Sequence, residues 1–471
     1  MIHSLHFVGV GGIGMSALAR MSASLGIVTT GSDRAAASPE NARIINALKS
    51  GGVRIFPQDG SVYDAVKPDA IVYSTAIEED NPDFAAAPAG TQRMHRSDAL
   101  KFLVEAVHAE NMIAVSGTCG KTSVSAHLAE ALYHLNEDPG VLCGGLVNAF
   151  VSPDLAGNFR AGAGKTFVVE ADESDKSLLH YTPDTAVILN IGTDHYSREE
   201  LAEVFRKFVS SARKRIVLAA ELLDDIGADA CAGRDTILFS GDPASPPVIQ
   251  GFPVVRLDSY RAGADGAFCS FDGQQEIPLR APGRHNALNA LAVYATLIQA
   301  GFPKKDAALA TGSFSGVWRR FDHTGKLSGG CRVYDDYAHN PEKIISCLEA
   351  AQSISAGKVI LLFQPHGFKP LRDMHPTLFE MLQDHLRPED IFGLLPVYYA
   401  GGTASFTPTS EEIAASFRER SGKAETYPYF ADRTAAEIFL QTHAEAGDTA
   451  VIMGARDNSL SIWAKKITEI T

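Results

Sequence analysis

The stretch Val115-Ser116-Gly117-Thr118-Cys119-Gly120-Lys121-Thr122 decides the fold of this chain, because it joins an apolar strand to a helix through a glycine turn. Glycines let backbone N–H groups approach phosphate oxygens, and the N-terminus of the helix adds its dipole. The common phosphate loop has a glycine five residues before its Gly-Lys pair, where this chain has Val115. We therefore predict a shortened phosphate loop for a polyphosphate, in which Lys121 neutralises the β- and γ-phosphates and the Thr122 hydroxyl ligates Mg²⁺.

A second glycine loop, Gly9-Val10-Gly11-Gly12-Ile13-Gly14, lies near the N-terminus, with Asp33 about twenty residues further on. This spacing is typical of a dinucleotide fingerprint, in which the acid binds a ribose hydroxyl. A nucleotide diphosphate held by backbone amides is the competing interpretation. Two phosphate cradles in one chain indicate two phosphorylated ligands and a reaction between them. The residues expected to bind the ligand of this first loop are Gly9, Gly11, Gly12, Ile13, Gly14, Met15, Ser32, Asp33 and Ser74.

The composition is that of a large globular protein. A chain of 471 residues predicts roughly three domains. The formal net charge of −14 argues against nucleic acid or an anionic membrane as the main partner. Six scattered cysteines without a Cys-x-x-Cys pair indicate neither a zinc site nor a disulfide framework, so we expect a reducing, cytoplasmic location. No apolar run is long enough to span a bilayer, and the N-terminus is expected to be a buried strand rather than a signal peptide.

Strands alternate with helices along the whole chain, which predicts an α/β protein with parallel sheets. The alternation restarts at residue 112 and again after residue 316. We expect three domains, each built on a largely parallel sheet: a Rossmann-like domain over residues 1–105, a P-loop-type ATPase domain over 106–315, and a second Rossmann-like domain over 316–471. Between residues 226 and 279, short alternating runs and turn residues predict a small, mostly antiparallel insertion.

Polar side chains follow two apolar strands of the middle domain, in Glu170-Ala171-Asp172-Glu173-Ser174-Asp175 and in Asn190-Ile191-Gly192-Thr193-Asp194-His195. Such strand ends lie on the ligand-binding edge of a parallel sheet. Glu170 and His195 could together hold a second divalent cation, with oxygen ligands suiting Mg²⁺ and an imidazole suiting Mn²⁺ better. A solvated acidic turn and a core histidine explain the spacing equally well.

The last part of the chain adds further polar motifs. Asn286 and Asn289, in Gly283-Arg284-His285-Asn286-Ala287-Leu288-Asn289, share one helix face and could read an adenine edge, unless one of them is simply an N-cap. Arg319-Arg320-Phe321 could clamp phosphates when domains close, or could be a solvated basic pair. The strand ends Tyr334-Asp335-Asp336-Tyr337-Ala338-His339-Asn340-Pro341 and Phe363-Gln364-Pro365-His366 are dense enough in polar groups to indicate a site.

Taken in order, these motifs resemble those of the Mur ligases of bacterial cell-wall synthesis, over nearly the whole chain. Within that family they are most similar to the ligases that add L-alanine. The resemblance implies that ATP phosphorylates the carboxylate of UDP-N-acetylmuramic acid to an acyl phosphate. The amino group of an amino acid then attacks this acyl phosphate to form an amide. A monomer or homodimer is expected.

The resemblance also implies residue roles. The loop from Gly9 to Met15 meets the diphosphate of the sugar nucleotide. Glu170 and His195 hold the second Mg²⁺, and His339 with the 363–366 strand end lies where the amino acid docks. The residues expected to bind ATP are Gly117, Thr118, Gly120, Lys121, Thr122, His285, Asn286, Asn289, Arg320 and Asp336. The residues expected to be catalytic are Lys121, Glu170, His195, Arg320 and His339, and those expected to bind metal are Thr122, Glu170 and His195.

The chain departs from the family pattern at Cys119, Gly192, Asn340, Gly367-Phe368-Lys369 and Arg456. Most of these departures lie around ATP or the amino acid. The nearest alternative is therefore a paralogous ligase that adds another amino acid or recycles a muropeptide onto UDP-N-acetylmuramic acid. A dinucleotide-dependent oxidoreductase is disfavoured because hydride transfer needs no ATP loop. A non-catalytic binding protein is disfavoured because Lys121, Glu170 and His195 occur together.

Overall fold

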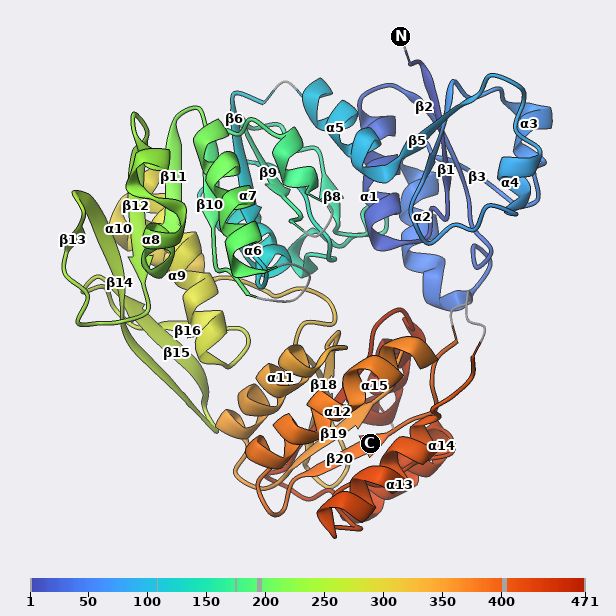
Figure 1. Ribbon diagram of the computed structural model, residues 1–471, viewed down its shortest axis with the longest axis vertical. Coiled ribbons are helices and arrows are strands. Elements are labelled where there is room, and N and C mark those ends of the chain that lie inside the picture. The colour runs from blue at the N-terminus through green and yellow to red at the C-terminus, as the bar shows by residue number, and fades with distance from the viewer. Residues whose placement is uncertain (1, 108, 174–175, 193–196, 400–404, 470–471) are drawn as a thin grey trace. The chain divides into compact units, whose positions relative to one another are not determined.

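The computed structural model describes residues 2–107, 109–173, 176–192, 197–399 and 405–469 (Figure 1). The chain forms two compact units. The first contains residues 1–259, 269–278 and 287–318, and the second contains residues 260–268, 279–286 and 319–471. No helix among the described residues combines the length and the apolar character that crossing a bilayer would require.

The first unit begins with a five-stranded sheet in the order β3-β2-β1-β4-β5, in which every pairing is parallel. Its central strand is fully buried at Leu5, Phe7 and Val8, because helices cover both faces of a parallel sheet. The strand order reverses beside β1, so the glycine loop that follows β1 opens at the topological switch point where such sheets bind ligands. The strands are β1 (Ser4–Val8), β2 (Val28–Ser32), β3 (Arg54–Phe56), β4 (Ala70–Tyr73) and β5 (Gln92–His95); the helices are α1 (Ile13–Ser24), α2 (Ala42–Ser50), α3 (Val62–Ala65), α4 (Pro82–Ala85) and α5 (Arg96–Ala106).

The second sheet of the first unit has eleven strands, in the order β16-β15-β14-β12-β11-β10-β6-β9-β7-β8, with β13 paired to β14. The phosphate loop follows β6 (Asn111–Ser116), which lies between β9 (Thr166–Glu170) and β10 (Thr185–Ile188) and is parallel to both. Other strands are β7 (Gly140–Leu142), β8 (Phe159–Arg160), β11 (Arg215–Ala219), β12 (Asp235–Ser240), β13 (Val248–Ile249), β14 (Phe252–Gly263), β15 (Gly266–Phe271) and β16 (Ile277–Leu279); the helices are α6 (Lys121–His134), α7 (Arg198–Ser211), α8 (Leu223–Ile226), α9 (Arg284–Gln299) and α10 (Lys304–Gly312).

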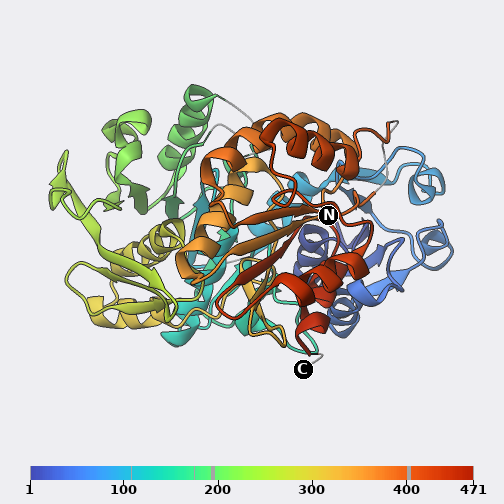
Figure 2. The same cartoon turned by 90° about the horizontal axis from the view of Figure 1, so that it is seen from below.

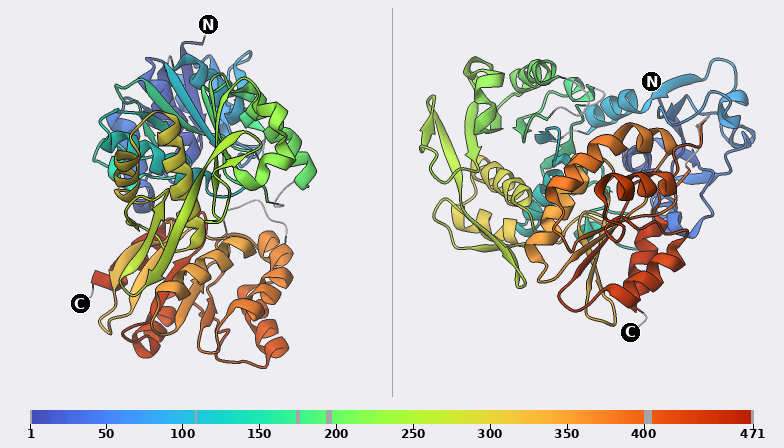
Figure 3. Two further views of the ribbon diagram at one scale, coloured as in Figure 1. Left: turned by 90° about the vertical axis from the view of Figure 1, so that its left-hand side faces the viewer. Right: turned by 60° about the horizontal axis from the view of Figure 1, so that its bottom comes forward.

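The predicted small, mostly antiparallel insertion between residues 226 and 279 was only partly right, because its strands belong to the main sheet and only some of their pairings are antiparallel. β12 pairs with β11 in parallel, and β14 pairs with β12 in parallel, so this segment extends the same sheet. The short alternating runs come from the long β14–β15 hairpin at the end of the sheet, drawn in yellow-green in the left panel of Figure 3. Local alternation describes a hairpin correctly, but it does not show which distant strand that hairpin joins.

Helix α6 of the first unit also holds the linker that leads to residue 319. His127 Nε2 lies 2.7 Å from the carbonyl oxygen of Thr311. The buried carboxylate of Glu130 accepts hydrogen bonds from the Ser315 amide at 3.0 Å and from its hydroxyl at 2.9 Å. The guanidinium of Arg43, from α2, lies 5.7 Å from the ring centre of Trp318 at the end of this linker.

The second unit has a five-stranded sheet in the order β17-β18-β21-β19-β20, parallel except for the edge strand β17. Alternate residues of its buried strands face opposite sides: Leu361 and Phe363 join one apolar cluster, and Ile360 and Leu362 the other. Figure 2 shows its strands between two helix layers. The strands are β17 (Asp322–Lys326), β18 (Arg332–Asp336), β19 (Val359–Phe363), β20 (Ile391–Leu394) and β21 (Thr449–Met453); helices α11 (Pro341–Ile354), α12 (Phe368–His385) and α13 (Ser410–Ser421) cover the first cluster, and α14 (Arg433–His443) and α15 (Ser459–Glu469) the second.

Candidate nucleotide and ligation site

The shortened phosphate loop adopts a conformation that needs its glycines. Gly117 and Gly120 have φ values of 142° and 88°. Gly120 is the N-cap of α6 and makes no side-chain capping bond, so the first N–H groups of the helix face the loop. Asn190 holds the loop in place, because its side chain accepts from the Cys119 amide at 2.8 Å and donates to the Cys119 carbonyl at 2.9 Å. The sequence placed Asn190 at a strand end but gave it no role.

Lys121 is held by acids of the middle domain. Its Nζ donates to the Gly117 carbonyl at 2.9 Å and to Glu173 Oε2 at 2.5 Å, and lies 3.8 Å from Asp172 Oδ1. Burial lowers the pKa of Lys121, but the carboxylates of Glu173 and Asp172 outweigh it, so its pKa is raised. For the Glu173 carboxyl, by contrast, burial raises the pKa. Glu173 is therefore the main partner of Lys121, a contact that the sequence did not predict.

Thr122 and Glu170, which were expected to ligate two different Mg²⁺ ions, lie together. Thr122 Oγ1 donates to Glu170 Oε1 at 2.9 Å, and Glu170 Oε2 accepts from the Gly144 amide at 2.7 Å. A hydroxyl and a carboxylate are hard oxygen ligands, so their chemistry fits Mg²⁺. Among the described residues, no group of three or more His, Cys, Asp and Glu side chains is arranged to hold a metal. His195 lies outside the described residues.

The first glycine loop is shaped by Asp33. Its carboxylate accepts from the amides of Gly11 at 2.9 Å and Ala35 at 2.8 Å, and a Cβ at Gly11 would lie 2.9 Å from Asp33 Oδ2. The Ser32 hydroxyl is fully buried and donates to Asp83, while its carbonyl accepts from the amides of Gly9 and Val10. The backbone at Gly12, Ile13 and Gly14, where α1 begins, is therefore the part of this loop open to a ligand; Met15 is buried behind it and Ser74 is half-buried at the end of β4.

One cavity of the first unit lies between the two glycine loops: its lining includes a residue of the first loop and a side chain that bonds the second. Gly14 belongs to the first loop, and Glu170 is the partner of Thr122 in the second. Arg96, at the start of α5, also faces this cavity, and its Nη2 lies 3.8 Å from Asp172 Oδ2. Two ligands bound at the two loops would thus meet in a shared space. The lining residues are Gly14, Ala17, Leu18, Arg96, Ser97, Leu100, Leu142, Cys143, Gly144, Glu170, Asp172 and Ser177.

The residues expected near adenine are divided between the two units. Asn289 lies against the phosphate loop, since its Oδ1 is 2.5 Å from the position of a Cβ on Gly120. His285 and Asn286 belong to the second unit. Asn286 Nδ2 donates to the Pro282 carbonyl at 2.7 Å, so Asn286 bonds backward into the turn, and burial lowers the pKa of His285.

The two adjacent arginines of the second unit have different environments. Arg319 is 1% exposed; its guanidinium donates to Asp335 at 3.2 Å and to the carbonyls of Asp457 at 3.0 Å and Gly454 at 2.5 Å. Arg320 is partly exposed, with its guanidinium 5.5 Å from the ring centre of Tyr337. Arg319 therefore fastens the loop between β21 and α15 to the sheet, and Arg320 is the arginine that a ligand can reach.

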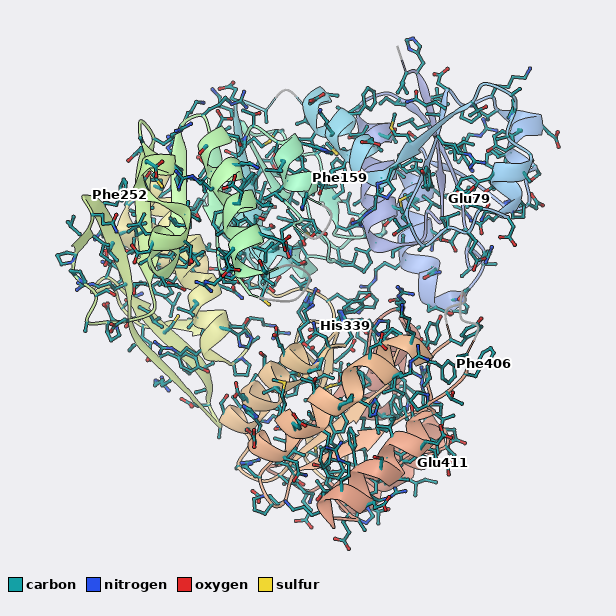
Figure 4. All side chains as sticks on the ribbon, viewed as in Figure 1. Glu79, Phe159, Phe252, His339, Phe406 and Glu411 are labelled. Atoms are coloured by element: carbon teal, nitrogen blue, oxygen red, sulfur yellow. The ribbon has the colours of Figure 1, made fainter. Side chains whose placement is uncertain are left out.

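Asp336 is the last residue of β18, and His339, labelled in Figure 4, follows three residues later. Asp336 accepts from the amides of Phe321 and Ala338, both at 2.7 Å, and burial raises its pKa. His339 Nδ1 lies 2.8 Å from the Tyr337 carbonyl, which makes Nδ1 the donor and Nε2 the acceptor in the neutral ring.

His339 and His366 form a pair, with ring centres 5.3 Å apart. Burial lowers the pKa of both to about 4, and nearby Arg456 adds to the shift at His366. Both imidazoles are therefore neutral at neutral pH. Tyr337 is a site residue that the sequence did not assign, and its hydroxyl lies 3.3 Å from the Arg456 amide. Asn340 instead caps α11, accepting from the Lys343 amide at 3.0 Å.

Three family models match successive parts of the chain: the Mur ligase family catalytic domain over residues 4–108, the Mur ligase middle domain over 115–297, and the Mur ligase glutamate ligase domain over 319–456. The chain belongs to the Mur ligase family. Its relatives include the UDP-N-acetylmuramate–L-alanine ligase of Sinorhizobium medicae, which is 33% identical over 99% of this chain and 97% of that protein. The same-named enzyme of Clavibacter michiganensis is 34% identical over 83% of this chain and 79% of that protein.

Solved structures agree with this fold. The UDP-N-acetylmuramate-alanine ligase of Thermotoga maritima has a TM-score of 0.76 at 25% identity and covers 99% of this chain and 98% of that chain. A murein peptide ligase of Psychrobacter arcticus has a TM-score of 0.66 at 22% identity, with 100% and 99% covered, and shows the fold alone. The predicted family, the three-domain α/β fold and the class of ATP-dependent Mur ligase are confirmed. The roles of single residues stay predictions.

Proposed function

We propose that this Mur ligase joins L-alanine to the carboxylate of UDP-N-acetylmuramic acid, with conversion of ATP to ADP and phosphate, in peptidoglycan precursor synthesis. The observation that carries the proposal is the cavity shared by Gly14 of the first loop and Glu170, the partner of the phosphate loop. Relatives named for this reaction align over nearly the whole chain. The sugar nucleotide binds at the first loop, and its carboxylate enters the shared cavity toward ATP.

The residues of the phosphate loop serve the first chemical step. A carboxylate oxygen attacks the γ-phosphorus, the bond to the β,γ-bridging oxygen breaks, and ADP leaves. Lys121 neutralises charge that builds up between the two anions, and the N–H groups at the start of α6 hold the phosphates. Thr122 would hold one Mg²⁺ or Mn²⁺, and Glu170 with His195 would hold a second one. Both ions would supply Lewis-acid stabilisation of the transferred phosphoryl group.

The second unit serves the second step. The amino group attacks the acyl phosphate, a proton leaves the nitrogen, and phosphate departs to give the amide. His339, held by the Tyr337 carbonyl through Nδ1, offers Nε2 to the amino group. Arg320 and Asp336 contribute to the nucleotide site, Asn286 and His285 to its adenine side. Acyl phosphates hydrolyse readily, so the site must exclude water before this step.

We also propose domain boundaries at residues 105/106 and 315/316, a monomer or homodimer, and a cytoplasmic location. A second candidate is the same ligation with another amino acid or a free peptide as the acceptor. It is favoured by Arg456, a cation close enough to His366 to lower its pKa. A cation at this place suits an acceptor with an additional carboxylate.

The test is a ligation assay with purified protein, UDP-N-acetylmuramic acid, ATP and Mg²⁺, in which phosphate release and product mass are measured with single amino acids and with free peptides. Release with L-alanine supports the first candidate, and release with a peptide alone supports the second. Lys121→Ala should abolish turnover while leaving binding of the sugar nucleotide nearly intact. Lys207→Ala is the matched control, because this exposed lysine pairs only with Glu203 one helical turn away on α7 among the contacts described. Equal loss of turnover and of sugar-nucleotide binding in Lys121→Ala would contradict separate sites for the two nucleotides.

A further inference from the structure

Arg96 carries the one positive charge among the described residues that line the shared cavity. It is the first residue of α5, and its side chain is 41% exposed. Its Nη1 lies 3.6 Å from the position of a Cβ on Gly14, at the end of the first glycine loop. The guanidinium therefore stands next to the cradle expected for the sugar nucleotide.

On its other side Arg96 faces the acids of the ATP cradle. Asp172 lies between two cations: its Oδ2 is 3.8 Å from Arg96 Nη2, and its Oδ1 is 3.8 Å from Lys121 Nζ. Both separations exceed a hydrogen bond, and Asp172 and Arg96 are each more than a third exposed, so each pairing is weak. An anionic ligand group can therefore compete with Asp172 for the Arg96 guanidinium.

We propose that Arg96 is a specificity-determining residue that binds the carboxylate of the sugar nucleotide, the same group that is phosphorylated in the reaction. This inference rests on the proposed function. The diphosphate is expected at the backbone N–H groups that begin α1, whereas Arg96 reaches from that point toward Asp172 and Lys121. The ligand group that must lie between the two cradles is the carboxylate.

Charge in the cavity supports the same assignment. Glu170 and Asp172 both line it, and their carboxylates repel an incoming carboxylate. A guanidinium offsets this repulsion and matches a carboxylate with two parallel hydrogen bonds. Arg96 would thereby favour a sugar nucleotide with a carboxylate over one without it.

The test compares binding of two ligands to the full chain without ATP. UDP-N-acetylmuramic acid and UDP-N-acetylglucosamine share the diphosphate and the amino sugar, but only the first has the carboxylate. By calorimetry, Arg96→Gln should weaken binding of the first ligand by about tenfold or more and change binding of the second less than about twofold, as expected for loss of one charge-assisted hydrogen-bond pair. Arg96→Lys should recover part of the loss. In turnover, the KM for the muramic acid nucleotide should rise while the KM for ATP stays unchanged.

Arg93→Gln is the matched control, because Arg93 is equally exposed in the same domain and pairs with Glu79 away from the cavity. An equal loss for both ligands would overturn the proposal and assign Arg96 to the diphosphate. Unchanged binding of both would also overturn it. A wild-type chain that prefers the carboxylate ligand but ligates no acceptor would refute the proposed function and leave the role of Arg96 intact.

Discussion

Replacement of Arg319 by methionine should destabilise the second unit strongly, although its neighbour Arg320 tolerates the same change. Arg319 is 1% exposed and bonds Asp335, which is itself fully buried. Methionine fills similar space but leaves Asp335 with an uncompensated charge and two loop carbonyls without their donor. Removal of one partner from a buried ion pair costs about 3–5 kcal/mol.

Hydrogen exchange resolved by segment measures this cost where it arises. Each 1.4 kcal/mol changes an equilibrium constant about tenfold, so amides of β18 and β21 should exchange roughly one hundred to several thousand times faster in Arg319→Met. Amides of β6 and β9 in the first unit should not change. Burial raises the pKa of Asp335. Protonation of Asp335 removes the uncompensated buried charge, so the stability difference between Arg319→Met and the wild type becomes smaller as pH falls.

Two further variants make the reasoning refutable. Arg320→Met should change exchange in β18 by less than about tenfold, since it removes a partly exposed side chain, while turnover is lost under its proposed role. The double variant Arg319→Met with Asp335→Leu should regain much of the stability, because an apolar pair can replace a buried ion pair. Acceleration below tenfold in Arg319→Met, or a double variant that is less stable than the single one, would refute the account.

Three other predictions follow from the sites. Gly120→Ala should raise the KM for ATP about tenfold or more, because its Cβ would meet Asn289 Oδ1 at 2.5 Å and the φ of 88° disfavours a side chain; an unchanged KM would count against it. Glu170→Gln should raise the Mg²⁺ concentration for half-maximal turnover, which a magnesium titration checks, and no shift would remove Glu170 from the metal site. The pKa of His339 and His366 is lowered to about 4, below the 6.5 of an unfolded chain, so the unfolded state binds more protons and the second unit should lose stability as pH falls from 6.5 toward 4; a urea midpoint equal at pH 7.5 and pH 5 would contradict this.

The fold was largely predictable from the sequence because the strands of its parallel sheets are short apolar runs with glycine or polar residues at their ends. β19 ends at Phe363, where the strand-end motif Phe363-Gln364-Pro365-His366 begins. Pairing between distant strands was not predictable. β12 and β14 look like an independent insertion locally, yet their backbone groups pair with the central sheet.

The site was predictable where chemistry and position coincide in one motif, as at Lys121 and Thr122. The site was not predictable where two adjacent residues of the same type have different roles. Nothing in Arg319-Arg320 shows which guanidinium is buried, because that depends on carbonyls more than a hundred residues away. Arg96 follows β5 directly, and this strand-end position was the one signal that could have marked it.

Trp318 gives this chain a built-in optical reporter. The chain has two tryptophans, and Trp463 is buried in the core of the second unit. In Trp463→Phe the tryptophan emission comes from Trp318 alone. The ring centre of Trp318 lies 5.7 Å from the Arg43 guanidinium. A shift in that emission when nucleotide or sugar nucleotide is added would follow the linker in real time, without any attached dye.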